Sequence, residues 1–201
     1  MRLYMLEGCP FAHRAVISLR EKGLPFETVF FRAGHRPPEL EAVGPRAKSP
    51  TLFDGDARVY DSQAVLEYLE ERTPEPALLP PTPLGRAEVR MLLARVSDEL
   101  ASKQYAVVGE LVKPEPDQAK LETARKELRG TFEAWNRHFE GRTWAVGDAL
   151  SLADLALYSL LAGAARPGGI EIGSEHAALR GWFDRMAARA TTEIPRPEPV
   201  A

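Results

Sequence analysis

The first 72 residues alternate short apolar segments with stretches of helical periodicity. Arg2–Leu6 and Glu27–Phe31 are rich in apolar, β-branched and aromatic residues, which favours two strands. Between them, apolar positions recur at helical spacing from Pro10 to Lys22, and Gly23 is placed to end that helix. A polar stretch follows, in which residues 38–43 predict one short helix.

A β-hairpin and another helix complete this half of the chain. The apolar segments Thr51–Phe53 and Arg58–Tyr60 flank Asp54-Gly55-Asp56, a sequence typical of a tight turn. Helical spacing then returns and ends before Thr73. The resulting order, βαβ, a short α, then ββα, predicts an α/β domain of the thioredoxin type over residues 1–73.

The chain after residue 73 has a different character. A linker at residues 74–83 holds Pro74, Pro76, Pro80, Pro81 and Pro83, which exclude a helix or a central strand there. No strand pattern follows, so residues 84–201 predict an all-α helical bundle. Its expected helices are one through Val89 and Leu100, a second over residues 121–139, a third that starts at Ser151, and a fourth over about residues 177–189.

Composition and charge narrow the classes of protein that remain. Apolar residues make up 44% of the chain, and 26 basic against 29 acidic side chains leave a net charge of −3. These values exclude general disorder and give no sign of a nucleic-acid-binding surface. The single cysteine, Cys9, excludes an intrachain disulfide and favours a reducing compartment. No secretory leader is evident, and the most apolar stretch has about 14 residues, too few to span a membrane. We therefore expect a cytoplasmic protein.

Cys9 is the first candidate for chemistry. It stands between a predicted strand and a predicted helix, and Pro10 after it favours the first helical position. The positive end of the helix dipole would then face the sulfur, an environment that favours thiolates, and His13 and Arg14 could add positive charge. A buried structural cysteine is the alternative.

The four histidines show no metal-ligand spacing, so we expect no metal site.

Two further motifs follow other strand boundaries. Ser49-Pro50 precedes a strand, where a cis proline would turn the Ser49 backbone toward the cysteine and allow pairing with an extended ligand. An edge-strand proline that only protects the sheet is equally compatible. Asp61-Ser62 opens a helix; Ser62 suits an N-cap, and its hydroxyl and the N–H groups after it could also hold a carboxylate. Asp61 could hold an ammonium group.

The order and spacing of these motifs resemble the glutathione transferase superfamily along nearly the whole chain. The resemblance rests on Cys9-Pro10-Phe11-Ala12, Lys48-Ser49-Pro50, Asp61-Ser62, the proline-rich linker and Ser151-Leu152-Ala153-Asp154. The first motif, with an arginine two residues later, is most similar to the omega class and its cysteine-type relatives, such as thioltransferases. Ala12 stands where glutaredoxins carry a second cysteine, which excludes a dithiol cycle on this chain.

The resemblance implies a role for each motif. Cys9 would hold the catalytic thiolate or form a mixed disulfide with glutathione, and the Phe11 backbone would lie beside the ligand sulfur. The Ser49 backbone would pair with the cysteinyl part of glutathione, with Pro50 in the cis form.

The ends of glutathione would bind at other residues. Asp61, in place of the more frequent Glu, and Ser62 would bind the γ-glutamyl amine and carboxylate. Arg36 falls where omega relatives carry a lysine for the glycyl carboxylate. The implied partners are glutathione, a small electrophile or mixed disulfide of unknown identity, and a second copy of the chain.

Three functions remain open from the sequence. The preferred one is a glutathione-dependent thiol transferase or reductase that acts through Cys9. The second is a transferase that conjugates glutathione to small electrophiles; Tyr4 lies within a predicted strand and is not placed like the tyrosine of such enzymes. The third is a non-catalytic scaffold, as in the stringent starvation proteins, which lack the active-site cysteine.

Overall fold

The structure is a computed structural model that describes residues 1–165 and 169–196. It divides into two compact units. The first contains Met1–Leu78 together with the C-terminal segment from Arg189, and the second is Leu79–Ala188. The sequence pattern assigns residues 84–201 to the helical part, whereas residues 189–196 group with the first unit. Within the described ranges, no helix has both the length and the apolar character needed to cross a membrane.

A four-stranded sheet forms the centre of the first unit. Its strands are β1 (Arg2–Leu6), β2 (Glu27–Phe31), β3 (Thr51–Asp54) and β4 (Ala57–Tyr60), in the order β2-β1-β3-β4. β1 and β2 are parallel, and β3 pairs antiparallel with both β1 and β4. The thioredoxin-like α/β arrangement expected from the sequence is confirmed.

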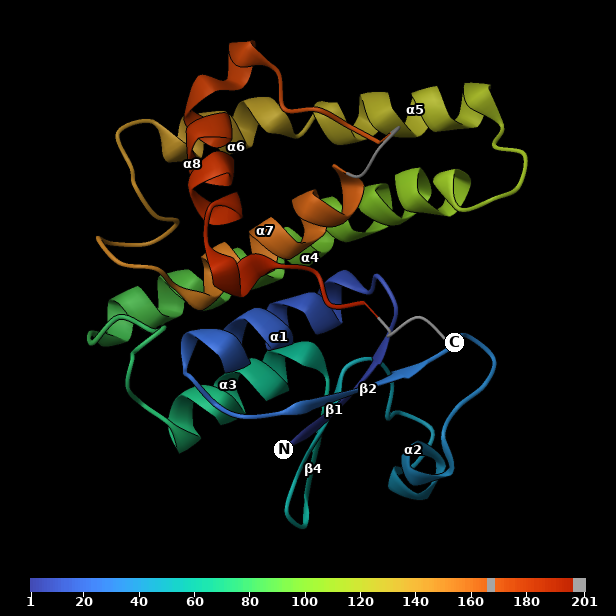
Figure 1. Ribbon diagram of the computed structural model, residues 1–201. Helices are drawn as coiled ribbons and strands as arrows, with labels where there is room; N and C mark the ends of the chain where they lie inside the picture. The colour runs from blue at the N-terminus through green and yellow to red at the C-terminus, as the bar shows by residue number, and fades with distance from the viewer. Residues whose placement is uncertain (166–168, 197–201) are drawn as a thin grey trace. The chain divides into compact units, whose positions relative to one another are not determined.

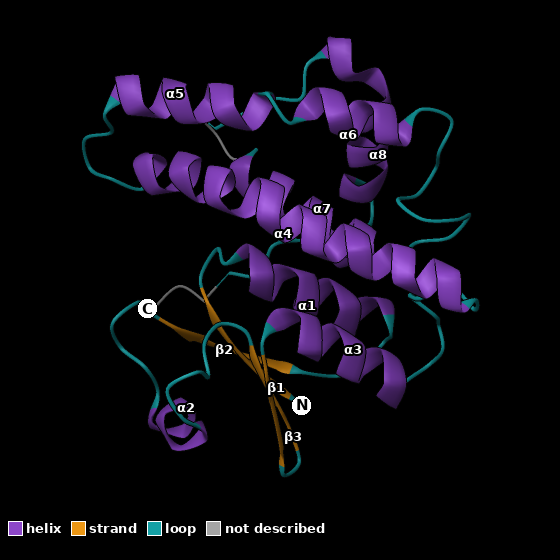
Figure 2. Cartoon of the chain, turned by 180° about the vertical axis from the view of Figure 1, so that it is seen from behind, coloured by secondary structure: helices purple, strands orange, loops and turns teal. Residues whose placement is uncertain are grey.

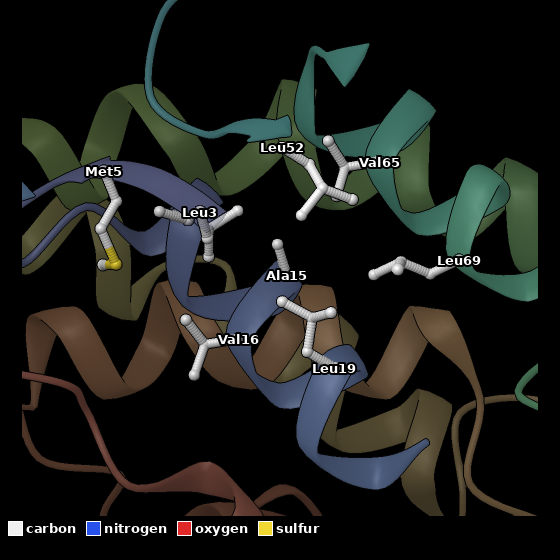
Figure 3. Packing of buried hydrophobic residues seen from close by; sticks show 9 residues of the cluster. Leu3, Met5, Ala15, Val16, Leu19, Leu52, Val65 and Leu69 are labelled. Carbon is white, nitrogen blue, oxygen red and sulfur yellow. The ribbon is translucent and has the colours of Figure 1, made fainter. Parts of the chain in front are cut away.

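Helices cover both faces of this sheet (Figures 1 and 2). α1 (Pro10–Glu21) and α3 (Ser62–Arg72) pack on one face, and α2 (Pro38–Val43) lies on the other. Side chains alternate between the faces with the period of a strand. Leu3, Met5 and Leu52 join the larger core, which Figure 3 shows between α1 and α3, and Tyr4 and Phe53 join Leu40 and Ala47 under α2.

A buried ion pair ties together the ends of α1 and α3. Lys22, directly after α1, has a fully buried side chain whose Nζ lies 2.7 Å from the Glu70 carboxylate of α3. The same ammonium donates to the carbonyls of Thr73 and Pro76, and Glu70 accepts from the Leu78 N–H. Each charge is therefore satisfied by several hydrogen bonds, as burial requires. Both helices are held at the ends opposite to their first turns.

The second unit is all helical, as expected. Its α-helices within the described residues are α4 (Pro83–Leu111), α5 (Gln118–Arg129), α6 (Phe132–Phe139), α7 (Leu152–Ala164) and α8 (Ala177–Ala187). The single helix predicted over residues 121–139 is wrong, because the chain breaks at Gly130-Thr131 and forms α5 and α6. Both helices bury apolar side chains three or four residues apart, so the helical spacing of buried residues continues across the break.

The start of α7 is organised around one buried carboxylate. Ser151 caps the helix in a capping box with Asp154, as the sequence predicted. Asp154 also accepts hydrogen bonds from the Ala145 N–H and the Trp182 indole, both at 2.8 Å. Burial raises the pKa of this carboxyl, and the surrounding donors oppose that effect. The motif is a structural element of the helical unit.

Candidate functional site

The strand register brings the predicted motifs to one edge of the sheet. Thr51, the first residue of β3, pairs with Tyr4 of β1 and with Tyr60, the last residue of β4. Residues just before β3 and just after β4 therefore lie at the edge where β1 ends. α1 and α3 both begin at this edge. Cys9, Ser49-Pro50 and Asp61-Ser62 consequently come together although they are far apart in the sequence.

Cys9 is the N-cap of α1, with Pro10 as the first helical residue. Its backbone carbonyl accepts from the His13 N–H at 3.0 Å, while its side chain makes no capping bond to the helix. The thiol is half-buried, and its Sγ lies 3.9 Å from the carbonyl oxygen of Ser49. The sulfur thus stands at the positive end of the helix dipole, beside the backbone of a second motif.

The loop that carries Ser49 is fixed from both sides. The Ser49-Pro50 peptide bond is cis, which confirms the expectation from the sequence. The Ser49 hydroxyl accepts a hydrogen bond from the Leu6 N–H at 2.9 Å, and the Thr51 hydroxyl donates to the Lys48 carbonyl at 2.6 Å. The first bond ties the loop to the end of β1, the strand that leads to Cys9, and the second ties it to the start of β3.

Asp61, rather than Ser62, caps α3. The carboxylate of Asp61 accepts from the Gln63 N–H at 2.9 Å, and Ser62 is the first helical residue. The assignment of Ser62 as the N-cap is therefore wrong. Among the described residues, Asp61 is the only non-glycine with a positive φ, 72°. Such strain persists only where the surroundings enforce it, and it is frequent at ligand sites. Ser62 is 7% exposed and lies at the positive end of α3.

Phe11 and Arg36 occupy less central positions. Phe11 is the second residue of α1, and the centroid of its ring lies 4.5 Å from the guanidinium carbon of Arg14. Arg36 lies before α2, and its Nη2 donates to the carbonyls of Leu40 and Gly44 at 2.8 and 2.7 Å. Part of its donor capacity is thus used to cap α2.

The positive charge that the sequence suggested at His13 is not present at neutral pH. His13 is 2% exposed, and burial lowers its pKa from 6.5 to about 4, against the opposing effect of a hydrogen bond to the Thr192 carbonyl. The neutral ring donates from Nε2 to that carbonyl at 2.8 Å. Sequence reasoning missed this contact, since Thr192 lies 179 residues away. Arg14 is completely buried.

The part of the chain that the structure describes contains no group of three or more His, Cys, Asp or Glu side chains able to hold a metal ion.

Comparisons with known proteins agree with this geometry. Residues 8–72 match the model of the glutathione S-transferase N-terminal domain, and residues 86–190 match that of the C-terminal domain. The chain belongs to the glutathione S-transferase family. The first domain match includes the candidate site from Cys9 to Ser62.

Relatives in this glutathione S-transferase family differ in their described roles. A glutathione S-transferase of Pseudomonas putida is 36% identical over 160 residues, 77% of this chain and 70% of the relative. A stringent starvation protein A homolog of Coxiella burnetii is 31% identical over 151 residues, 75% and 69% of the two chains. A Methylobacterium radiotolerans glutathione S-transferase, solved with glutathione sulfonate, has a TM-score of 0.79 and 27% identity over 100% of this chain and 97% of its own.

Proposed function

We propose that this glutathione S-transferase family member is a thiol transferase that uses Cys9 in monothiol exchange with glutathione. The observation that carries the proposal is a half-buried cysteine at the N-terminus of α1, with its Sγ 3.9 Å from the Ser49 carbonyl. Cys9 is the only cysteine of the chain, so the exchange needs a second glutathione rather than a second protein thiol.

The exchange has two steps. The Cys9 thiolate attacks the glutathionyl sulfur of a mixed disulfide, forms a bond to that sulfur and releases the substrate thiolate, which takes up a proton. A second glutathione thiolate then attacks the glutathionyl sulfur on Cys9, releases oxidised glutathione and returns the Cys9 thiolate. In sum, one mixed disulfide and one glutathione give the free substrate thiol and oxidised glutathione, so the disulfide bond is exchanged and no other reductant is needed.

Glutathione would bind along the edge where β1, β3 and β4 meet. In this proposal the Ser49 backbone would pair with the cysteinyl part, and the N-terminus of α3 with Asp61 and Ser62 would bind the γ-glutamyl amine and carboxylate. The related structure solved with glutathione sulfonate supports a glutathione ligand for this fold. In this proposal Arg36 binds the glycyl carboxylate in addition to the two carbonyls near α2 to which its Nη2 donates.

A non-catalytic scaffold is the second candidate, because relatives named stringent starvation protein A homolog are as similar to this chain as two plant glutathione S-transferases. Conjugation of electrophiles is less well supported by the site. Tyr4 is 1% exposed and packs on Phe53, 4.6 Å between ring centroids, so its hydroxyl belongs to the core under α2.

A homodimer is part of the proposal. α4 and its C-cap residue carry exposed apolar side chains at intervals of seven residues or a multiple of seven: Leu84, Met91 and Tyr105 in the helix, and Val112 at the cap. This spacing places them on one face of the helix, as in helices that pack against a partner helix. The family resemblance makes a second copy of the chain the expected partner.

Two substrates distinguish the candidate functions. The wild-type protein and Cys9→Ser are assayed with a glutathionylated peptide and with a chlorinated aromatic electrophile, each with reduced glutathione. Activity of the wild type on the peptide, lost in Cys9→Ser, supports thiol transfer. Conjugation that survives in Cys9→Ser supports the electrophile transferase, and the lack of both activities supports the scaffold.

A further inference from the structure

One side of α1 is covered by the C-terminal segment of the chain. His13, Arg20 and Glu21 lie seven and eight residues apart and so share one helix face. Against them lies η2 (Ala190–Thr192), a short helix that follows α8 (Figure 1). We call residues Arg189–Glu193 the strap. It belongs to the same compact unit as α1, so its contacts lie within that unit.

The far end of α1 holds the strap by a charged pair. Arg189 donates from Nε and Nη2 to the two carboxylate oxygens of Glu21 at 2.8 and 2.7 Å, and the Thr191 hydroxyl bonds to the same carboxylate. Burial raises the pKa of Glu21, but the hydrogen bonds from Arg189 and Thr191 outweigh it and lower the pKa overall. This bidentate geometry fixes both side chains in position.

The strap then approaches the start of the helix. Arg20 donates to the carbonyls of Thr191 and Glu193, and His13 donates to the Thr192 carbonyl at 2.8 Å. His13 lies one turn after Cys9, and its own N–H bonds to the Cys9 carbonyl at 3.0 Å. The strap therefore holds the side chain of a residue whose backbone N–H bonds to the carbonyl of the candidate nucleophile.

The two sides of α1 are held by different kinds of interaction. Toward the sheet, α1 packs through Ala12, Ala15, Val16 and Leu19, and apolar packing carries no directional preference. Toward the strap, it is held by hydrogen bonds to backbone carbonyls and by a bidentate ion pair, whose geometry is directional. The buried pair of Lys22 and Glu70 also holds the end of α1, but of these two directional contacts it is the strap that reaches His13, one turn after Cys9.

We propose that the strap positions Cys9. By holding His13, Arg20 and Glu21, it fixes α1 along its axis and keeps the Cys9 sulfur beside the Ser49 carbonyl, where the exchange takes place. His13 and Glu21 are then positioning residues. The catalytic part of this inference rests on the proposed thiol exchange, whereas the geometric part concerns only the placement of the sulfur.

The test compares two variants that each lose an ion pair within the same unit. Glu21→Gln weakens the strap. Asp54→Asn weakens the pair between Asp54 and Arg72, whose side chains are 16% and 41% exposed, against 10% and 33% for Glu21 and Arg189. Asp54 ends β3 next to the hairpin turn, at the opposite end of the strand from Ser49. Loss of unit stability alone would affect both variants in the same way.

Alkylation by iodoacetamide reports on Cys9 alone, because the chain has no other cysteine. A misplacement of about 1 Å can cost on the order of a hundredfold in rate, so we expect Glu21→Gln to change the alkylation rate by about threefold or more and to lower kcat for exchange by about tenfold. The KM for glutathione should change little. Asp54→Asn should match the wild type in both rates. The charge-reversed double variant Glu21→Arg with Arg189→Glu should recover both.

Two results would overturn the inference. One is a folded Glu21→Gln protein whose alkylation and kcat equal those of the wild type. The other is a pair of equal changes in Glu21→Gln and Asp54→Asn, which would indicate general destabilisation. If the wild type shows no exchange, the proposed function fails, but the alkylation rates still decide whether the strap positions the sulfur.

Discussion

Protonation of buried His13 should make the protein less stable in mild acid. The ring is 2% exposed, and its pKa is lowered to about 4, whereas the same ring in an unfolded chain titrates near 6.5. Between these values the unfolded state binds more protons than the folded state. The free energy of unfolding therefore falls as the pH decreases from about 7 toward 4, and this contribution is lost in full below about pH 4.

The size of the effect follows from the two pKa values. With a folded pKa of about 4 and an unfolded value of 6.5, the loss at pH 5 is about 2 kcal/mol relative to neutral pH. This is a large share of a typical folding free energy of about 5–15 kcal/mol. His13→Gln keeps an N–H donor for the Thr192 carbonyl but has no group that titrates in this range.

Urea unfolding, followed by circular dichroism at pH 7 and pH 5, measures the effect. The destabilisation caused by His13→Gln should be smaller at pH 5 than at pH 7 by about 2 kcal/mol, because only the wild type loses stability through this ring. His35→Gln, at an exposed histidine of the same unit, is the matched control and should show no such difference. A His13→Gln cost that is equal at both pH values would refute the reasoning.

Three other predictions concern separate regions. Ser62→Ala should weaken glutathione binding about tenfold to a hundredfold in calorimetric titration, because the ligand carboxylate loses a hydrogen bond. The melting temperature should change little, because Asp61 provides the cap of α3. An unchanged affinity would show that Ser62 does not bind the ligand. Asp154→Ala should lower the free energy of unfolding in urea by about 3 kcal/mol or more, because the donors around the carboxylate lose their acceptor. The control Asp148→Ala, at an exposed aspartate, should leave that free energy almost unchanged. A decrease below about 1 kcal/mol for Asp154→Ala would contradict this prediction. Met91→Glu should convert a dimer into a species near the 22.2 kDa chain mass in sedimentation equilibrium, and a wild type that already sediments at that mass would exclude the homodimer.

The sequence predicts the local elements of this protein well, because strand alternation and helical spacing are short-range signals. The strands and helices from Arg2 to Arg72 begin and end within about two residues of the expected positions. The break between α5 and α6 escaped the pattern because the buried stripe has the same spacing on both sides of it. Gly130 was the one local sign of that break.

The candidate site was predictable to the extent that its motifs are local. Cys9, the cis Ser49-Pro50 bond and Asp61 each stand at a strand boundary, and the topology brings such boundaries to one edge. The sequence did not decide between Asp61 and Ser62 as the cap of α3, because both residue types are favoured there. The strap was not predictable, since no periodicity connects His13 with Thr192.

Intact-mass spectrometry of the protein during turnover tests the central claim, that Cys9 carries glutathione, most directly. The wild type is mixed with a glutathionylated peptide in the absence of free glutathione, and its mass is then measured before and after reduced glutathione is added. We expect the mass to increase by one glutathionyl group, located on Cys9 by peptide mapping, and to return to the starting value after the addition. Release of the free peptide thiol on addition of glutathione, without any adduct on Cys9 at either stage, would contradict the account.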